Sequence, residues 1–217
     1  MTTEIKKIYT RRARFYDISE KIYALFGFRE EKYRRIAINK LNLKEGDLVV
    51  DLGCGTGKNF SQIQKIIGPT GKIIGVDFTL PMLQQAQRKV TKFGWKNVSL
   101  VEADMSEYLF PENVDAVLST FALSFCEKYD TVIKQVQSHL RDDGRIVVAD
   151  MQWNQTLPKW FMRLFMLSAR PFGVSEDTLK RNLFFSFKNH FRSSTADRYY
   201  FGCVCVIKGT KLSSLPI

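Results

Sequence analysis

The sequence predicts an α/β fold in which helices cover both faces of a mostly parallel sheet. Short apolar runs with the character of buried strands alternate with longer helical stretches, such as residues 80–93 and 129–140, and this alternation is typical of βαβ units. A loop with three glycines follows the first apolar run, and an acidic residue ends the second. Ligands of such sheets bind beyond the carboxyl ends of the strands, which is where these residues fall.

The length favours a single domain. A chain of 217 residues is long enough for one sizeable core, and two complete domains would be cramped. We divide residues 1–217 into an N-terminal helical cap (1–45), a ligand-binding core (46–152), an insertion with a cap (153–190) and a closing strand pair (191–210).

The first strand runs into a glycine loop at residues 47–57. Gly53, Gly55 and Gly57 alternate with other residues, and glycine lets a backbone turn sharply and approach a ligand without a Cβ in the way. The loop therefore predicts a small molecule that lies against main chain.

Spacing separates the nucleotide folds that use such a loop. A phosphate-binding Walker loop needs a glycine and a Ser or Thr where Leu52 and Asn59 stand, so that interpretation fails. A dinucleotide fingerprint needs glycine at position 58, which is Lys58, so a nicotinamide oxidoreductase is disfavoured but stays open.

The second strand, residues 72–77, ends in Asp77. Asp77 follows the glycine loop by about 20 residues, the distance at which a carboxylate can accept hydrogen bonds from ribose hydroxyls. A helix N-cap is the alternative role for a single Asp, and the position at a strand end favours the ligand.

With Asp51 the loop reads D-x-G-x-G-x-G, which resembles the first motif of class I S-adenosylmethionine-dependent methyltransferases. Residues 77–83 resemble the D-x-S-x-x-M-L motif of the same family, with Thr79 in place of the Ser. The resemblance covers about residues 46–152. It implies a Rossmann-like three-layer sandwich with a seven-stranded, mostly parallel sheet and an antiparallel C-terminal hairpin.

The resemblance also implies the cofactor S-adenosyl-L-methionine and the product S-adenosyl-L-homocysteine. Phe78 and Met82 would flank the adenine, and Asp104 would lie near its amino group, beyond a third strand at residues 98–102. A fourth strand at 114–119 opens into the wall between cofactor and substrate. The expected cofactor-binding residues are Asp51, Gly53, Cys54, Gly55, Gly57, Asp77, Phe78, Met82, Asp104, Met105, Thr120 and Phe121.

The elements after the fourth strand are a fifth strand at 145–150, which follows the turn at residues 142–144, and several C-terminal segments. The latter are an apolar helical stretch at 157–169 that ends at a breaker at 170–173, a helix at 178–189, strands at 194–200 and 202–208, and a tail from residue 211.

Three residues are candidates for the substrate side: Tyr16, Phe125 and Trp160. Tyr16 belongs to a Tyr-Asp element that resembles one before the first helix of the family's quinone and phospholipid-headgroup subgroup, where it folds over the cofactor. Packing is an equally good explanation for it. Methyl transfer from a sulfonium mainly requires alignment of the acceptor and the exclusion of water. We therefore assign no general base, and we give no catalytic role to His139 or His190.

The four cysteines, Cys54, Cys126, Cys203 and Cys205, have no metal-ligand spacing, and we expect small apolar packing residues and no metal.

The net charge of +11 is unevenly placed. Residues 1–46 carry 12 Lys or Arg against 6 acids, residues 47–150 carry 11 against 13, and residues 151–217 carry 10 against 3. The basic ends favour an anionic partner. The bulky apolar residues of the insertion favour a hydrophobic or amphipathic acceptor and a peripheral membrane contact, and packing of a helix on the sheet is at least as good an explanation for half of them. A merely solvated basic face is the alternative.

Methyl transfer to a small acceptor, such as a lipid headgroup or a quinone precursor, is therefore the predicted function. The sequence has neither the Asn-Pro-Pro-aromatic signature nor an appended module of nucleic-acid methyltransferases, which makes nucleic acid the less favoured acceptor. A catalytically silent cofactor-binding protein stays open. The charged N-terminus and the lack of a long apolar run predict a cytoplasmic protein. The sequence does not indicate an oligomeric state.

Overall fold

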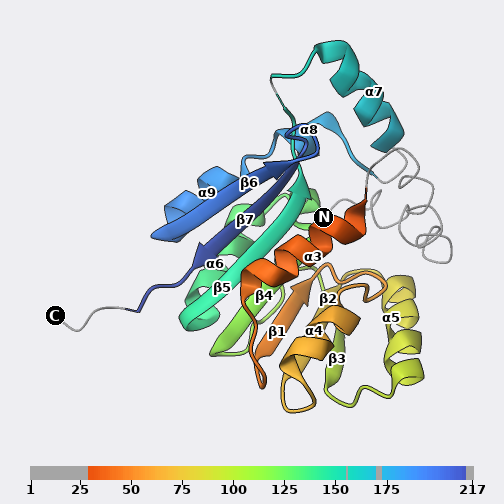
Figure 1. Cartoon of the computed structure of the whole chain (residues 1–217), viewed down its shortest axis with the longest axis vertical. Coiled ribbons are helices and arrows are strands. Elements are labelled where there is room, and N and C mark those ends of the chain that lie inside the picture. Colours follow the sequence, from red (N-terminus) through yellow and green to blue (C-terminus); the bar gives the residue numbers. More distant parts are fainter. Residues whose placement is uncertain (1–28, 155, 170–172, 214–217) are drawn as a thin grey trace.

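The computed structural model describes residues 29–154, 156–169 and 173–213 (Figure 1). Its centre is one seven-stranded sheet with the order β3-β2-β1-β4-β5-β7-β6. The first five strands are parallel, and β7 pairs antiparallel with both β5 and β6, as predicted. The strands are β1 (Leu48–Leu52), β2 (Lys72–Asp77), β3 (Val98–Glu102), β4 (Val114–Thr120), β5 (Leu140–Met151), β6 (Ser193–Tyr199) and β7 (Val204–Thr210).

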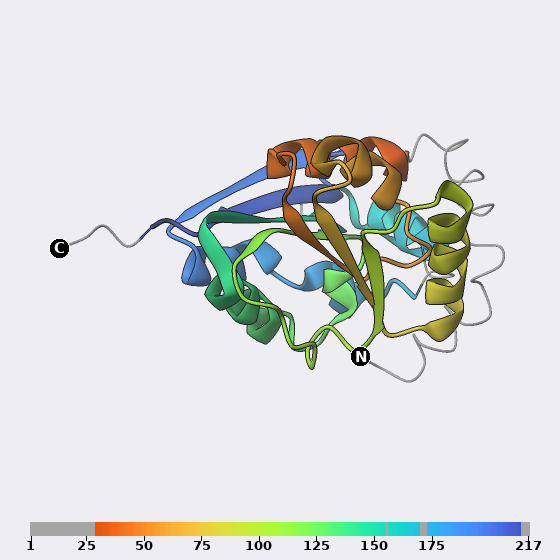
Figure 2. The same ribbon diagram turned by 90° about the horizontal axis from the view of Figure 1, so that it is seen from below.

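Helices lie on both faces of the sheet and make three layers. Figure 2 shows α3 and α4 on one side of the strands and α6 and α9 on the other. The helices are α3 (Glu30–Leu41), α4 (Phe60–Ile67), α5 (Leu80–Phe93), α6 (Tyr129–His139), α7 (Lys159–Ala169), α8 (Glu176–Lys180) and α9 (Leu183–His190), and a short 3-10 helix, η1 (Leu123–Phe125), follows β4.

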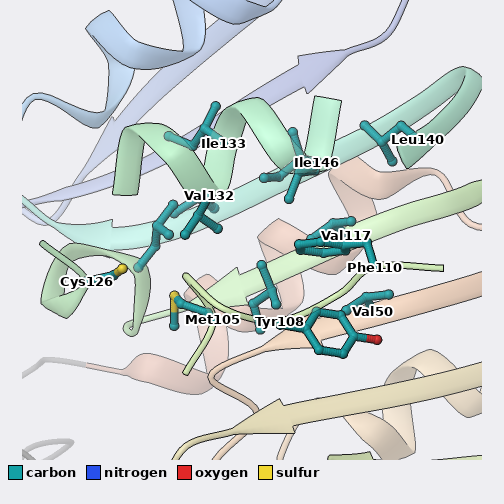
Figure 3. Close-up of a cluster of buried hydrophobic side chains, with 14 of the residues drawn as sticks. Val50, Met105, Tyr108, Phe110, Val117, Cys126, Val132, Ile133, Leu140 and Ile146 are labelled. Carbon is teal, nitrogen blue, oxygen red and sulfur yellow. The ribbon is translucent and has the colours of Figure 1, made fainter. Parts of the chain in front are cut away.

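Strand alternation divides the core in two, because successive side chains point to opposite faces of a sheet. Val49 of β1 packs with Phe60 of α4 and with residues of α3 and α5. Its neighbour Val50 packs in the other cluster, which α6 and α9 cover. In Figure 3 the α6 residues Val132 and Ile133 lie over the strands that carry Val117 and Ile146.

Local chemistry fixes the bounds of α5, the helix that follows the predicted ribose carboxylate. Pro81 stands in its first turn, where the missing N–H of proline is no loss. Gly94 ends the helix in a left-handed conformation (φ 66°), and its N–H donates to the carbonyls of Thr91 and Val90. Glycine adopts this conformation without strain.

Two predicted element bounds were wrong. The turn expected at 142–144 lies inside β5, which already begins at Leu140; the strand absorbs the extra residues through a register shift against β4 and a positive φ at Asp143. The helix expected at 178–189 is two helices, because the Asn182 side chain accepts a hydrogen bond from the Phe185 N–H (3.1 Å) and starts α9 anew.

The insertion after β5 forms α7 and α8 at the carboxyl end of the sheet (Figure 1). In the ranges that the structure describes, no helix has both the length and the apolar character needed to cross a membrane.

Candidate functional site

The glycine loop leaves β1 in a conformation that requires glycine. Gly53, Gly55 and Gly57 all have positive φ, at 68°, 54° and 72°. The Gly53 N–H donates to the Val76 carbonyl of β2 at 2.8 Å, and a Cβ on Gly53 would lie only 2.3 Å from the Cβ of Ala122. The loop is therefore held against two neighbouring strands, with no room for a side chain at its first glycine.

Asp77 holds this loop from the end of β2. One carboxylate oxygen accepts a hydrogen bond from the Gly55 N–H and the other accepts one from the Thr79 N–H, both at 2.9 Å. Each oxygen keeps a second lone pair, so the carboxylate can still accept two hydroxyl donors. Burial raises the pKa of Asp77, and the two backbone hydrogen bonds oppose that rise.

A cavity of about 660 Å³, including the space open at its mouth, lies beside the loop and Asp77. Ten of the residues predicted for the site line it together: Gly53, Cys54, Gly55, Asp77, Phe78, Met82, Met105, Thr120, Phe121 and Phe125.

The other predicted residues lie elsewhere. Gly57 packs beneath the loop, where its Cβ would meet the ring of Phe60 at 2.6 Å. Asp104 accepts hydrogen bonds from the N–H and hydroxyl of Ser106, both at 2.9 Å, beside the cavity-lining Met105. Trp160 is on α7 with 68% of its surface exposed, and Tyr16 is outside the described residues.

Arg34 is a cavity residue that the sequence interpretation did not single out. It reaches the cavity from α3, donates a hydrogen bond to the Thr120 hydroxyl, and places its guanidinium 5.4 Å from the centre of the Phe121 ring. Glu30, one turn earlier, forms an ion pair with it at 3.0 Å. The guanidinium faces Thr120 and Phe121 at the end of β4, so it places a positive charge on that side of the cavity.

Asp51 lies beneath the cavity and is completely buried. The side-chain amide of Asn59 donates to both of its oxygens, at 3.1 and 3.0 Å, and to the Thr120 hydroxyl at 3.0 Å. Burial raises the pKa of Asp51 to about 7, although the hydrogen bond from Asn59 and the charge of Arg34 oppose the rise. Asp51 therefore positions Asn59 and Thr120 from below.

The pKa of Asp51 predicts a pH dependence of stability. The folded state keeps the proton up to a pKa of about 7, whereas the unfolded chain loses it near 3.8. The free energy of unfolding should therefore fall as the pH rises from about 4 to about 7. Asp150, with a pKa of about 6, acts in the same direction over a narrower range. In the Asp51→Asn variant the free energy of unfolding should still fall as the pH rises to about 6, because Asp150 remains. It should no longer fall between pH 6 and 7. Guanidinium unfolding at half-unit pH steps measures this, and parallel curves for the two proteins would contradict it.

A polar clamp fixes the turn that carries Phe125. The Asp150 carboxylate accepts hydrogen bonds from the N–H and the hydroxyl of Ser124, both at 2.8 Å. Arg181 donates to the Ser124 carbonyl at 2.6 Å. Ser124 is thus held at all three of its polar groups, from β5 and from the link between α8 and α9, and the neighbouring Phe125 is held with it.

The side chains that surround Phe125 on the side of the insertion are apolar. Phe125 packs with Val174 and Leu179, and the half-buried Phe78, Met151 and Trp153 lie against that cluster. Phe78 and Phe125 also line the cavity. The two rings therefore separate the cavity from an apolar region formed by the insertion.

The two histidines lie away from the cavity. His139 faces Glu112 at 3.7 Å, and His190 contacts Asp130 at 3.1 Å, on the side of the sheet that α6 and α9 cover. Neither of them lines the cavity. In the described ranges, no three His, Cys, Asp or Glu side chains form a group that could hold a metal ion.

Comparisons with known proteins agree with this geometry. A family model described as a methyltransferase domain matches residues 43–196. The demethylmenaquinone methyltransferase of Geobacillus sp. (strain WCH70) is 29% identical over 147 residues, which are 64% of this chain and 63% of that relative. The enzyme of the same name from Lactobacillus johnsonii (strain CNCM I-12250 / La1 / NCC 533) is 28% identical over 82% of this chain and 75% of its own.

A solved structure of geranyl diphosphate methyltransferase, in complex with GPP and sinefungin, shares the fold. It superposes with a TM-score of 0.67 at 15% identity, over 84% of this chain and 78% of its own.

Proposed function

The chain belongs to the methyltransferase-domain family, and from this premise we propose that it transfers a methyl group from S-adenosylmethionine to a small hydrophobic or amphipathic acceptor. The observation that carries the proposal is the position of Asp77. Its carboxylate borders the cavity, is fixed by the glycine loop and keeps the capacity to accept two hydroxyl groups.

The residues of the cavity fit this cofactor. Asp77 would hold the ribose, because a carboxylate at the end of the second strand accepts paired hydroxyls. Phe78 and Met82 would pack against the adenine ring. The main chain at Gly53 and the cation of Arg34 would hold the amino-acid end, which carries a carboxylate. A Cβ on Gly53 would clash with Ala122, so only glycine lets the main chain lie this close to the residues that line the cavity after β4.

When bound, S-adenosylmethionine supplies a methyl group on a positively charged sulfur. The residues around it mainly need to orient the acceptor and exclude water. Phe121 and Phe125, each 7% exposed, form a dry wall for this purpose. The clamp on Ser124 keeps Phe125 in place, so the wall is preorganised.

The proposed acceptor is apolar in part, because the region beyond Phe125 is lined by aromatic and aliphatic side chains. Two relatives carry a name for the methylation of demethylmenaquinone, a quinone, and this supports a ring-bearing, hydrophobic acceptor. The first of them is matched over 63% of its length, so the acceptor is a proposal that requires its own test.

The test is methyl transfer from radiolabelled S-adenosylmethionine into a whole-cell extract, followed by partition between organic and aqueous phases. The purified chain should place label in the organic phase, and Asp77→Ala should not. Label in nuclease-sensitive material would indicate nucleic acid as the acceptor. Cofactor binding without any label would indicate a silent binding protein. Tighter binding of NADH than of S-adenosylmethionine would contradict the proposal altogether.

The clamp on Ser124 should affect stability and methyl transfer more than it affects binding of the cofactor. Arg181→Met removes the hydrogen bond to the Ser124 carbonyl, and we expect the free energy of unfolding to fall by about 1–2 kcal/mol. Methyl transfer should fall as well, because Phe125 loses part of its support, while affinity for S-adenosylhomocysteine changes by less than about threefold. Chemical unfolding and calorimetric titration measure the two effects.

Arg181→Lys is the matched control, because it keeps a cation that can donate to the carbonyl. If Arg181→Met and Arg181→Lys lose methyl transfer equally, the hydrogen bond to Ser124 is not the cause.

A further inference from the structure

We propose that one surface of this protein docks on an anionic lipid bilayer. The docking surface consists of Trp160 and Leu167 of α7 and Phe201 of the turn between β6 and β7, with Lys159 and Arg163 of α7 beside them. Interfacial segments of this kind combine large apolar side chains with cations that meet lipid headgroups.

The α7 residues share one face of their helix. Trp160 and Leu167 are seven residues apart, about two helical turns, and they are 68% and 64% exposed. Met162 points the other way and is completely buried. Lys159 and Arg163 are exposed, and Arg163 lies between Trp160 and Leu167 along the exposed face. The helix therefore exposes both apolar bulk and positive charge, and it lies beyond the end of β5 (Figure 1).

Phe201 is held outward by a strained turn. Its φ is 54° and that of Tyr200 is 49°, a region that bulky side chains rarely adopt. Asn154 keeps the turn in place by donating to the Phe201 carbonyl at 2.6 Å. The Phe201 side chain nevertheless stays 70% exposed. The ring also meets that of Tyr200 edge to face, with 5.5 Å between the ring centres, so the turn holds Phe201 in a defined and largely exposed position.

The turn and α7 form one surface. Cys203, two residues after Phe201, is completely buried, and its sulfur lies 3.9 Å from the sulfur of Met162 on the inner face of α7. This contact joins the base of the turn to the helix, so the exposed side chains of the two elements belong to the same end of the molecule.

Charge identifies the occupant. The docking surface itself carries the exposed cations Lys159 and Arg163, and anionic headgroups attract cations at such a surface. Glu176 and Asp177 of α8 are the exposed acids of the insertion, and Glu176 pairs with Lys180. Trp and Phe with adjacent cations suit the boundary between headgroups and acyl chains. A second copy of this chain would bring the same positive charge and be repelled.

The insertion that carries α7 also contributes side chains that pack against the wall of the cavity. Leu179 of α8 packs on Phe125, which lines the cavity, and Trp153 lies against the same cluster. A bilayer under α7 would therefore stand next to the apolar region where the acceptor is expected. This last step, delivery of an acceptor from the bilayer, rests on the proposed function; the docking itself does not.

Vesicle flotation tests the docking. The full chain should float with vesicles of phosphatidylcholine and phosphatidylglycerol (about 7:3), bind neutral phosphatidylcholine vesicles several-fold less, and lose binding as salt is raised. The double variant Leu167→Gln, Phe201→Asn should lower the bound fraction at least about fivefold. Asn tolerates positive φ, so this change removes the ring without adding strain.

Phe93→Gln is the matched control. Phe93 is an exposed aromatic (56%) at the end of α5, at the opposite edge of the sheet, and this variant should bind as the unchanged chain does. Thermal unfolding checks that every variant is folded. A further readout is a blue shift of tryptophan emission on vesicle addition, which Trp160→Phe should remove while binding persists.

Three results would overturn the inference: no flotation of the unchanged chain, equal flotation of the double variant, or a concentration-dependent dimer that the same two substitutions abolish, which would assign the surface to a second copy. None of these readouts uses methyl transfer. An active enzyme that does not float would therefore contradict the docking alone, and a floating chain without activity would contradict the proposed function alone.

Discussion

Asp77→Ala should abolish detectable binding of S-adenosylhomocysteine while the protein remains folded. The variant loses an acceptor for two hydroxyl groups, and hydrogen bonds to a charged group contribute about 1.5–3 kcal/mol each. The expected loss of affinity is therefore at least about 100-fold. It also releases the N–H groups of Gly55 and Thr79, which Asp77 holds at 2.9 Å, so the loop becomes less preorganised.

The free energy of unfolding of this variant should fall by about 1–3 kcal/mol, because the N–H groups of Gly55 and Thr79 lose their acceptor, while removal of a carboxylate whose pKa burial raises offsets part of that loss. Calorimetric titration measures the affinity, and thermal unfolding confirms the fold. Asp197→Asn, which changes an exposed carboxylate paired with Lys40, serves as the control and should bind normally. Unchanged affinity in Asp77→Ala would remove this carboxylate from the site.

Gly53→Ala should destabilise the protein by about 2–5 kcal/mol. A residue with a Cβ at φ 68° costs about 1–2 kcal/mol, and overpacking a rigid site costs about 1–3 kcal/mol more. The new methyl group would lie 2.3 Å from Ala122. Because Ala122 precedes η1, relief of this clash would shift the wall formed by Phe121 and Phe125.

Gly55→Ala separates the two causes. Gly55 has a similar φ of 54°, but a Cβ there meets no atom within 4 Å. The free energy of unfolding of Gly55→Ala should therefore fall only by the cost of the backbone conformation, about 1–2 kcal/mol. Guanidinium unfolding without ligand measures both variants. Equal losses of stability would show that backbone conformation, and not contact with Ala122, makes glycine necessary at position 53.

The elements that the sequence predicted well are those whose signals are local. The apolar runs of β1 to β4 end within a residue or two of the predicted positions, since alternation and turn residues are read within a short window. The error at β5 has a physical reason: residues 142–144 resemble a turn, but the strand pairs with β4 on both sides of them, at Leu140 and from Arg145 onward, and Asp143 and Gly144 exchange main-chain hydrogen bonds with Lys211. Such pairing is decided by residues far away in the chain.

The residues of the site also fall into those that a local sequence signal predicts and those that it does not. The glycine loop, Asp77 and the residues after β3 and β4 could be predicted, because each follows a strand end and parallel strands bring such ends together. Arg34 and the clamp of Asp150 and Arg181 on Ser124 could not. They act across 86, 26 and 57 residues of sequence, and nothing in their immediate surroundings marks them.

The sequence by itself determined the family, the sheet and the ligand cradle, because glycine geometry, strand alternation and capping are short-range properties of the chain. Only the tertiary structure decided which side chains complete the cavity, which of the predicted carboxylates face it and which lie beneath it, and that Trp160, Leu167 and Phe201 stay exposed. Those features depend on contacts between distant segments, and on burial that no short window of sequence contains.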